Sequence, residues 1–141
     1  MEGAVSMNLA YVETRFVTAD TAQDWPEKFA IISAYSTTGE VWSHDQNEAA
    51  DQKLKAQLSL ENVWLRRVIG YSPKTGHREP SWAAEISPAD ACNCSVRFKQ
   101  DAIYYVTGDD LWVSHCDARR QMIRVGNFRE RVEDHHDITE M

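Results

Sequence analysis

The sequence predicts an α+β domain in which a ferredoxin-like sheet carries two helices on one face. Two observations lead to this prediction. Apolar runs of strand length alternate with two segments that begin with helix-capping residues, and the resulting order is strand-helix-strand-strand-helix-strand. Right-handed crossovers between such elements favour the split ferredoxin-like arrangement. The 141 residues fit one domain over 1–141.

The first strand and helix of this unit have the clearest signals. Residues 29–35 form a continuous apolar run, which is typical of a strand buried on both faces. Ser43 and Gln46 match the S-x-x-Q pattern of a capping box, so a helix is expected from Ser43 to about Leu58. Its inward stripe has helical spacing and consists of Asn47, Ala50, Leu54 and Leu58.

The second half of the unit is expected to consist of two strands, a helix and a further strand. Two strands are expected at 63–70 and 81–86, separated by a loop with turn residues. Ser87 is expected to cap a second helix over Pro88–Lys99, because proline is favoured in the first helical turn. A fourth strand follows at 102–106.

Shorter elements are expected outside this unit. Residues 102–106 and 111–115 predict a C-terminal hairpin. A short N-terminal helix is expected between Val5 and Tyr11, and residues 1–8 and 133–141 are expected to be frayed. Two further short strands are expected, at 15–18 and 121–125.

Composition excludes several classes of function. A net charge of −7 argues against a nucleic-acid-binding protein, which needs a basic face. No apolar run approaches the length of a membrane span, and the N-terminus lacks the pattern of a signal peptide, so we expect a cytoplasmic protein. Three cysteines, an odd number, do not make a disulfide framework.

The polar residues that could form a site lie at the ends of the expected strands and helices, where clefts open. Hydroxyl, amide, imidazole and carboxylate groups occur there, and these can bind a ligand by hydrogen bonds. Neither a catalytic residue set nor a cofactor is expected. The candidate ligand-binding residues are Tyr35, Ser43, Asn47, His77, Glu79, Ser81 and Gln100.

Metal ligation is not expected. Cys92 and Cys94 are two residues apart on a predicted helix, about 200° around its axis, so they cannot both bind one ion. On a strand, His115 and Cys116 likewise face opposite sides.

Three functions from different classes are consistent with these residues. The leading hypothesis is a non-catalytic or regulatory protein that binds a small molecule or a protein partner. The second is a small enzyme in which His77 and Glu79 form an acid-base pair, for which an exposed ion pair is the structural alternative. The third is a protein-interaction module or an acidic inhibitor protein, including a homodimer formed through a strand edge.

Several short clusters of the sequence follow one another in a recognisable order. They are Ala10-Tyr11, Thr14, Phe16, the run 29–35, Ser43, Asn47, Leu54, Gly70-Tyr71, Glu79-Pro80-Ser81-Trp82, Phe98, Gln100 and Ala102-Ile103. Taken in order, these clusters resemble a bacterial family known as domain of unknown function 3293. The resemblance runs from about Leu9 to Asp117 and implies a small soluble bacterial domain without an assigned reaction. The chain departs from the family pattern at Ser36-Thr37, where Asn-Pro is usual, and at Lys99, where glycine is usual.

Overall fold

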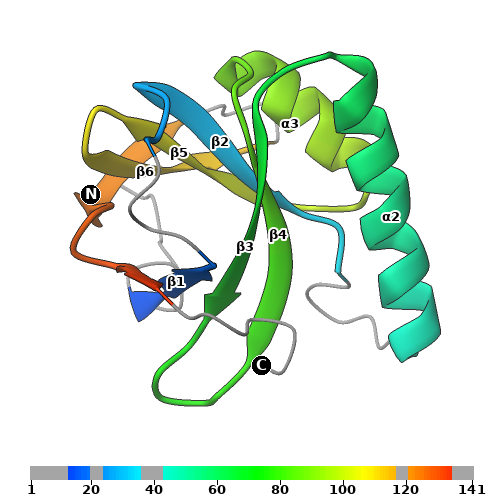
Figure 1. Cartoon of the computed structure of the whole chain (residues 1–141), viewed down its shortest axis with the longest axis horizontal. Helices are drawn as coiled ribbons and strands as arrows, with labels where there is room; N and C mark the ends of the chain where they lie inside the picture. The colour runs from blue at the N-terminus through cyan, green and yellow to red at the C-terminus, as the bar shows by residue number, and fades with distance from the viewer. Residues whose placement is uncertain (1–12, 20–23, 36–42, 117–120, 135–141) are drawn as a thin grey trace.

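The computed structural model describes residues 13–19, 24–35, 43–116 and 121–134. Within these residues, eight strands form one sheet in the order β7-β6-β5-β2-β4-β3-β1-β8. The strands are β1 Arg15–Thr18, β2 Lys28–Ser33, β3 Leu65–Tyr71, β4 Arg78–Ala84, β5 Ala102–Thr107, β6 Asp110–His115, β7 Met122–Asn127 and β8 Val132–Asp134. Two helices, α2 His44–Leu60 and α3 Pro88–Arg97, pack against this sheet (Figure 1).

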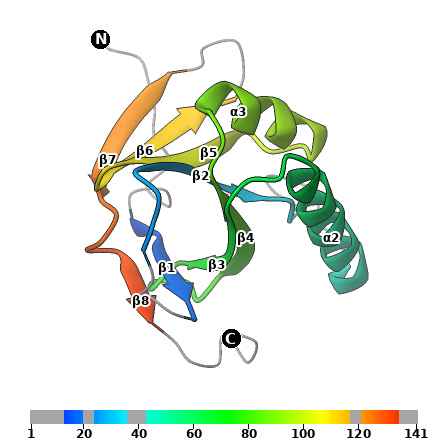
Figure 2. The same ribbon diagram turned by 45° about the horizontal axis from the view of Figure 1, so that its top comes forward.

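The sheet is mixed and strongly curved. Its neighbouring strands are antiparallel, except that β1 and β8 run parallel. Figure 2 shows the strands following an arc from β7 to β8, with α2 and α3 outside it. A shift in register between Leu111 and Trp112 bends β6 against β7, as bulges do. The result is a half-barrel whose concave side carries no helix from the described residues.

Alternation along the strands divides the apolar residues between two cores. In β2, Ala30 and Ile32 belong to the outer core, between the sheet and the helices. Phe29 and Ile31 belong to the inner core, which fills the curve of the half-barrel. The fully apolar character of β2 is therefore explained by burial on both faces.

Both helices begin where their capping residues predict. Ser43 and Gln46 form the reciprocal hydrogen bonds of a capping box. The Ser87 hydroxyl accepts a hydrogen bond from the Asp90 amide, and Pro88 lies in the first turn of α3. Lys99 follows the C-cap of α3 with φ +59°, a left-handed conformation that glycine adopts most readily.

The predicted ferredoxin-like α+β class, with two helices on one face, is wrong. The succession strand-helix-strand-strand-helix-strand is present as β2-α2-β3-β4-α3-β5, but these strands are only half of an eight-stranded, curled, mostly β structure. The expected hairpin is present as β5 and β6, and its strands extend the same sheet. The reason is physical: the inner face of β2 is apolar, and the curl of the sheet covers it.

β8 joins the two ends of the described chain. Phe16 of β1 is paired with Val132 of β8, and Arg15 and Tyr71 both donate hydrogen bonds to the Glu133 carboxylate. Glu133 and Asp134, which we expected to be frayed, are therefore part of a strand. The expected N-terminal helix lies outside the described residues.

Candidate functional site

A buried ion pair joins α2 to the outer face of the sheet. Asp51 is buried, and Arg67 of β3 donates two parallel hydrogen bonds to it, Nη1 to Oδ1 at 2.9 Å and Nη2 to Oδ2 at 2.5 Å. The Trp82 indole Nε1 of β4 donates a third hydrogen bond, at 3.1 Å, to Asp51 Oδ1. Paired, bidentate geometry of this kind is the arrangement in which a buried charge is tolerated.

The fold brings these three side chains together for simple reasons. Arg67 and Trp82 are directly opposite each other in the antiparallel register of β3 and β4, so both point to the outer face. Asp51 lies on the buried stripe of α2 with Leu54 and Leu58. The guanidinium carbon of Arg67 lies 3.9 Å from the centre of the Trp82 ring, so the cation stacks on the ring.

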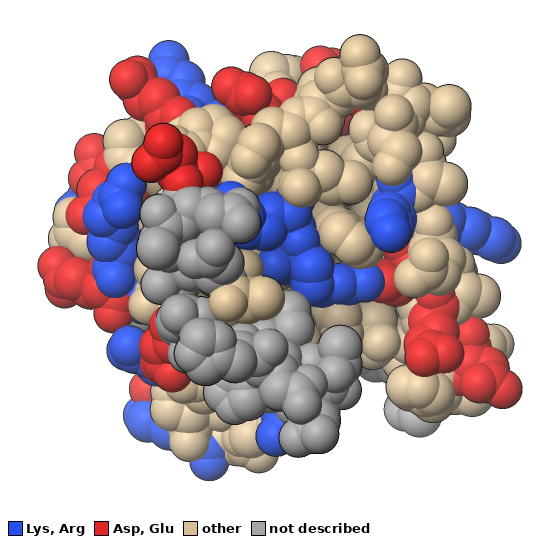
Figure 3. Space-filling view, viewed as in Figure 1, with Lys and Arg blue, Asp and Glu red and all other residues tan. Residues whose placement is uncertain are grey.

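Lys55 and Tyr35 border this cluster. The Lys55 ammonium is 5.3 Å from the Trp82 ring centre, so two cations lie close to one aromatic ring. The pKa of the Tyr35 hydroxyl is raised, mainly because the side chain is partly buried. The negative charges of Asp51 and Glu48 raise this pKa further, whereas the positive charge of Arg67 lowers it. Figure 3 shows Lys and Arg side chains gathered over β3 and β4 and toward α2.

Two of the residues predicted from the sequence are in direct contact near this cluster. The Gln100 carboxamide donates a hydrogen bond of 2.7 Å to the main-chain oxygen of Tyr35. It also donates to the Phe98 oxygen at 3.3 Å. Gln100 therefore ties the end of β2 to the segment between α3 and β5, which is a structural role.

Ser43 and Asn47 lie at the start of α2. Ser43 is its N-cap, and Asn47 is half-buried, one helical turn before Asp51. Both residues are thus on the helix that supplies Asp51 and Lys55.

Of the remaining predicted residues, His77 directly precedes β4, and Glu79 and Ser81 lie on β4, on the opposite face of the sheet from Trp82. Alternation places Glu79 and Ser81 on the face of Ala83, which belongs to the inner core. The Ser81 hydroxyl donates to the Glu79 main-chain oxygen at 3.0 Å. His77 Nε2 is 3.5 Å from Glu79 Oε2, with the two side chains 70% and 30% exposed. The sheet therefore separates the His77–Glu79 pair from the α2 cluster.

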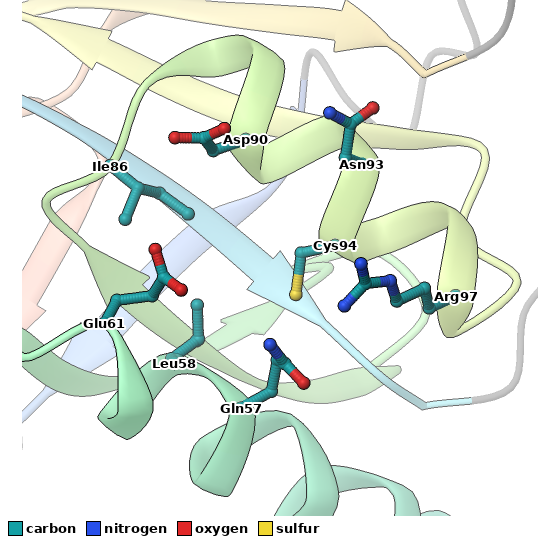
Figure 4. A pocket seen from close by; sticks show the side chains of 8 residues that line it. All are labelled: Gln57, Leu58, Glu61, Ile86, Asp90, Asn93, Cys94 and Arg97. Atoms are coloured by element: carbon teal, nitrogen blue, oxygen red, sulfur yellow. The ribbon is translucent and has the colours of Figure 1, made fainter.

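A small groove lies between α2 and α3, at the other end of α2. Figure 4 shows the Cys94 side chain directed between the two helices. The cavity volume is about 180 Å³, below the roughly 300–1,000 Å³ of ligand pockets. Burial raises the pKa of the Cys94 thiol, which disfavours a nucleophilic thiolate. The groove is lined by Gln57, Leu58, Glu61, Ile86, Asp90, Asn93, Cys94 and Arg97.

Two other features, a metal site and a membrane-spanning helix, are absent from the described residues. No group of three or more His, Cys, Asp or Glu side chains in this part of the chain is arranged to hold a metal ion. No helix in the same residues has the length and apolar character needed to cross a membrane.

Sequence reasoning missed Asp51, Lys55, Arg67 and Trp82 as site residues. A signal for Asp51 was present, because a carboxylate stands between Ala50 and Leu54 on the predicted inward stripe. A buried carboxylate requires a partner, and a strand arginine beside an aromatic position is a suitable one. Which strand would supply that arginine depends on pairing, which the sequence pattern does not give.

The fold and the cluster define a single-sheet, half-barrel domain in which two cations lie beside a buried tryptophan next to the longer helix. The chain belongs to the family described as "Protein of unknown function (DUF3293)", whose model matches residues 32–103. This match spans the elements that carry the α2 cluster, from the end of β2 to the start of β5. Searches of curated proteins and of solved structures found no match.

Proposed function

We propose that this protein is a non-catalytic binding protein, and that its ligand is a small organic anion received by Arg67 and Lys55. The single observation that carries the proposal is the Arg67 side chain, which is 27% exposed and whose guanidinium is fixed in place by Asp51. A cation held rigidly at a surface loses little conformational entropy when it binds an anion.

The hydrogen bonds of Arg67 support a second acceptor. A guanidinium has five N–H donors in a fixed plane. Two donate to Asp51, and a third donates at 3.3 Å to the main-chain oxygen of Ser81. Donors therefore remain for a carboxylate or phosphate that approaches from the exposed edge.

Two cations beside one indole ring support an anionic ligand, although the carboxylates of Asp51 and Glu48 also act on the neighbouring Tyr35. Lys55 adds a second positive charge over the same indole ring, and Asp51 is already neutralised by Arg67. The net charge of the whole chain is −7, so the pair of cations at this position is not explained by the overall composition. Tyr35 contributes a half-buried hydroxyl to the same region.

The enzymatic alternative receives weaker support. The His77 and Glu79 side chains lie 3.5 Å apart at the start of β4, 70% and 30% exposed, where water screens any charge that they carry. The protein-interaction and acidic-inhibitor hypotheses have no specific contact in their favour. We therefore place the ligand at the α2 cluster.

Thermal unfolding with defined anions tests the proposal. The probes are inorganic phosphate and succinate, with succinamide as the uncharged analogue and sodium chloride as the ionic-strength control. A ligand at a hundred times its dissociation constant stabilises by about 2.7 kcal/mol, which raises Tm by roughly 8 °C in a domain of this size. A shift with succinamide or sodium chloride equal to that with the anions would rule out anion recognition.

A matched pair of variants locates the binding site. Lys55→Gln is expected to reduce the anion-induced shift, whereas Lys53→Gln removes the same charge from an exposed position of the same helix and is expected to preserve it. Titration calorimetry with phosphate and succinate measures the two affinities directly. Equal affinities in the two variants would place the anion elsewhere.

A further inference from the structure

Two cysteine sulfurs are in direct contact in the outer core. Sγ of Cys92, on α3, lies 2.8 Å from Sγ of Cys116, which directly follows β6. Their residues are 1% and 4% exposed. We propose that Cys92 and Cys116 are a redox pair that forms an intrachain disulfide bond between α3 and the end of β6. This inference is independent of the anion site.

The distance between the sulfurs is the main support. A disulfide S–S bond is about 2.0 Å long, so the two sulfurs need to approach by less than about 1 Å. The surrounding contacts hold both residues in place. Cys92 Sγ lies 3.8 Å from the Ser114 hydroxyl and from the His115 main-chain oxygen, and the Cys116 amide donates to the Asp101 oxygen at 2.9 Å.

The third cysteine serves as an internal reference. Cys94 is on the same helix, but its thiol faces the groove between α2 and α3 (Figure 4). On a helix, residues two apart point about 200° from each other. Cys94 therefore cannot replace Cys92 as the partner of Cys116 without rotation of α3.

Glutathione disulfide is a suitable oxidant, and the reaction balances with it. One cysteine thiolate attacks a sulfur of glutathione disulfide, the S–S bond of the oxidant breaks, and one glutathione thiolate leaves. The second cysteine thiolate attacks the resulting mixed disulfide, forms the Cys92–Cys116 bond and releases the second glutathione. The two protein thiols lose two electrons and two protons, and two glutathione thiols are formed.

The bridge should stabilise the fold, and the fold should favour the bridge. The bridge closes a loop of roughly 25 residues. For a loop of that length, the chain-entropy model predicts that the equilibrium constant for forming the disulfide is on the order of a hundredfold larger in the folded chain than in the unfolded chain. The same coupling is expected to raise Tm by about 10 °C on oxidation.

Refolding in a glutathione buffer tests which cysteines pair. The full chain is unfolded with reductant, diluted into mixed reduced and oxidised glutathione, and quenched by alkylation. We expect a mass lower by two hydrogen atoms and a proteolytic fragment that links Cys92 to Cys116. Cys94→Ser is expected to behave in the same way, whereas Cys92→Ala and Cys116→Ala are not.

A second measurement uses only the unmodified sequence, so a variant that fails to fold does not decide the outcome. The equilibrium constant for oxidation of the two thiols by glutathione disulfide is measured in native buffer and in concentrated urea. The constant in native buffer is expected to exceed the constant in urea by at least tenfold. Equal constants would overturn the proposal. A bridge to Cys94, or glutathione mixed disulfides alone, would also overturn it.

Discussion

The two faces of the sheet are covered in different ways, although they are built from alternate residues of the same strands. The outer face carries small residues such as Ala30 and Ala84 among larger ones, and two helices pack against it. The inner face carries Phe16, Phe29 and other aromatic residues, and the curvature of the sheet closes over them. Small side chains let a helix approach a sheet, whereas large rings fill a concave surface.

The polar interactions of the two faces also differ. On the outer face, Arg67 stacks on Trp82 and is neutralised by the buried Asp51 carboxylate. On the inner face, the Arg66 guanidinium lies 4.4 Å from the ring centre of Trp25 and 5.0 Å from that of Trp64. Adjacent arginines thus have different partners because the strand directs them to opposite sides.

The largest expected effect tests the inner face. Phe29 is fully buried, with ring centres 5.3 Å from Trp25 and from Phe128. Phe29→Ala should lower the free energy of unfolding by about 3–5 kcal/mol, because the substitution leaves a cavity that the neighbouring aromatic rings cannot fill. Urea unfolding measures this loss. Leu60→Ala, at a side chain 79% exposed, is the control and should change stability far less. Similar losses in the two variants would contradict the assignment of the inner core.

The next effect tests the ion pair of the outer face. Asp51→Ala should lower the free energy of unfolding by about 2–4 kcal/mol, because Arg67 is left without its counter-charge in a largely buried position. In the double variant with Arg67→Leu, part of this loss should return, since no uncompensated charge remains. A double-mutant cycle by chemical unfolding gives the coupling between the two residues. Additive effects would show that the pair does not fasten α2 to the sheet.

The smallest effect is pH-dependent and tests the seam between the two ends of the sheet. Partial burial tends to raise the pKa of Glu133, but hydrogen bonds from Arg15 and Tyr71 and the charge of Arg15 together lower it. A carboxylate whose pKa is lower in the folded chain than in the unfolded chain stabilises the fold. This stabilisation is complete at pH values above the unfolded-state pKa, and it is lost as the pH falls through the folded-state pKa.

Glu133→Gln should therefore cost less than about 1 kcal/mol near neutral pH, because the pair is partly exposed. The difference from the wild type should shrink as the pH falls below the ordinary glutamate pKa of about 4.3 and through the lowered pKa of folded Glu133. Urea unfolding across this pH range measures it, with Glu85→Gln at an exposed position as the control. A difference that does not depend on pH would exclude the carboxylate as its source.

The local elements were predictable because their signals lie within a few residues. The capping box of Ser43 and Gln46 and the Ser87-Pro88 start are such signals, and both helices begin there. The family's usual glycine at position 99 agrees with the left-handed backbone that Lys99 adopts. Local chemistry of this kind is independent of what the strands pair with.

The curvature and the site were not predictable in the same way. Alternation shows which residues share a face, but it does not show that β8 pairs with β1 or that the sheet curls over Phe29. Asp51 was assigned to no role because charged helical residues are usually solvated. Its partner Arg67 depends on the register of β3 against β4 and on the placement of α2, which are long-range properties.

The three-residue strand β8 has a consequence for how copies of this chain behave toward one another. It occupies the free side of β1, whose backbone groups would otherwise be open to any passing strand. Truncation before Val132 would leave the longer strand β1 at the edge of the sheet, where it is a better template for β-sheet addition than the three-residue β8.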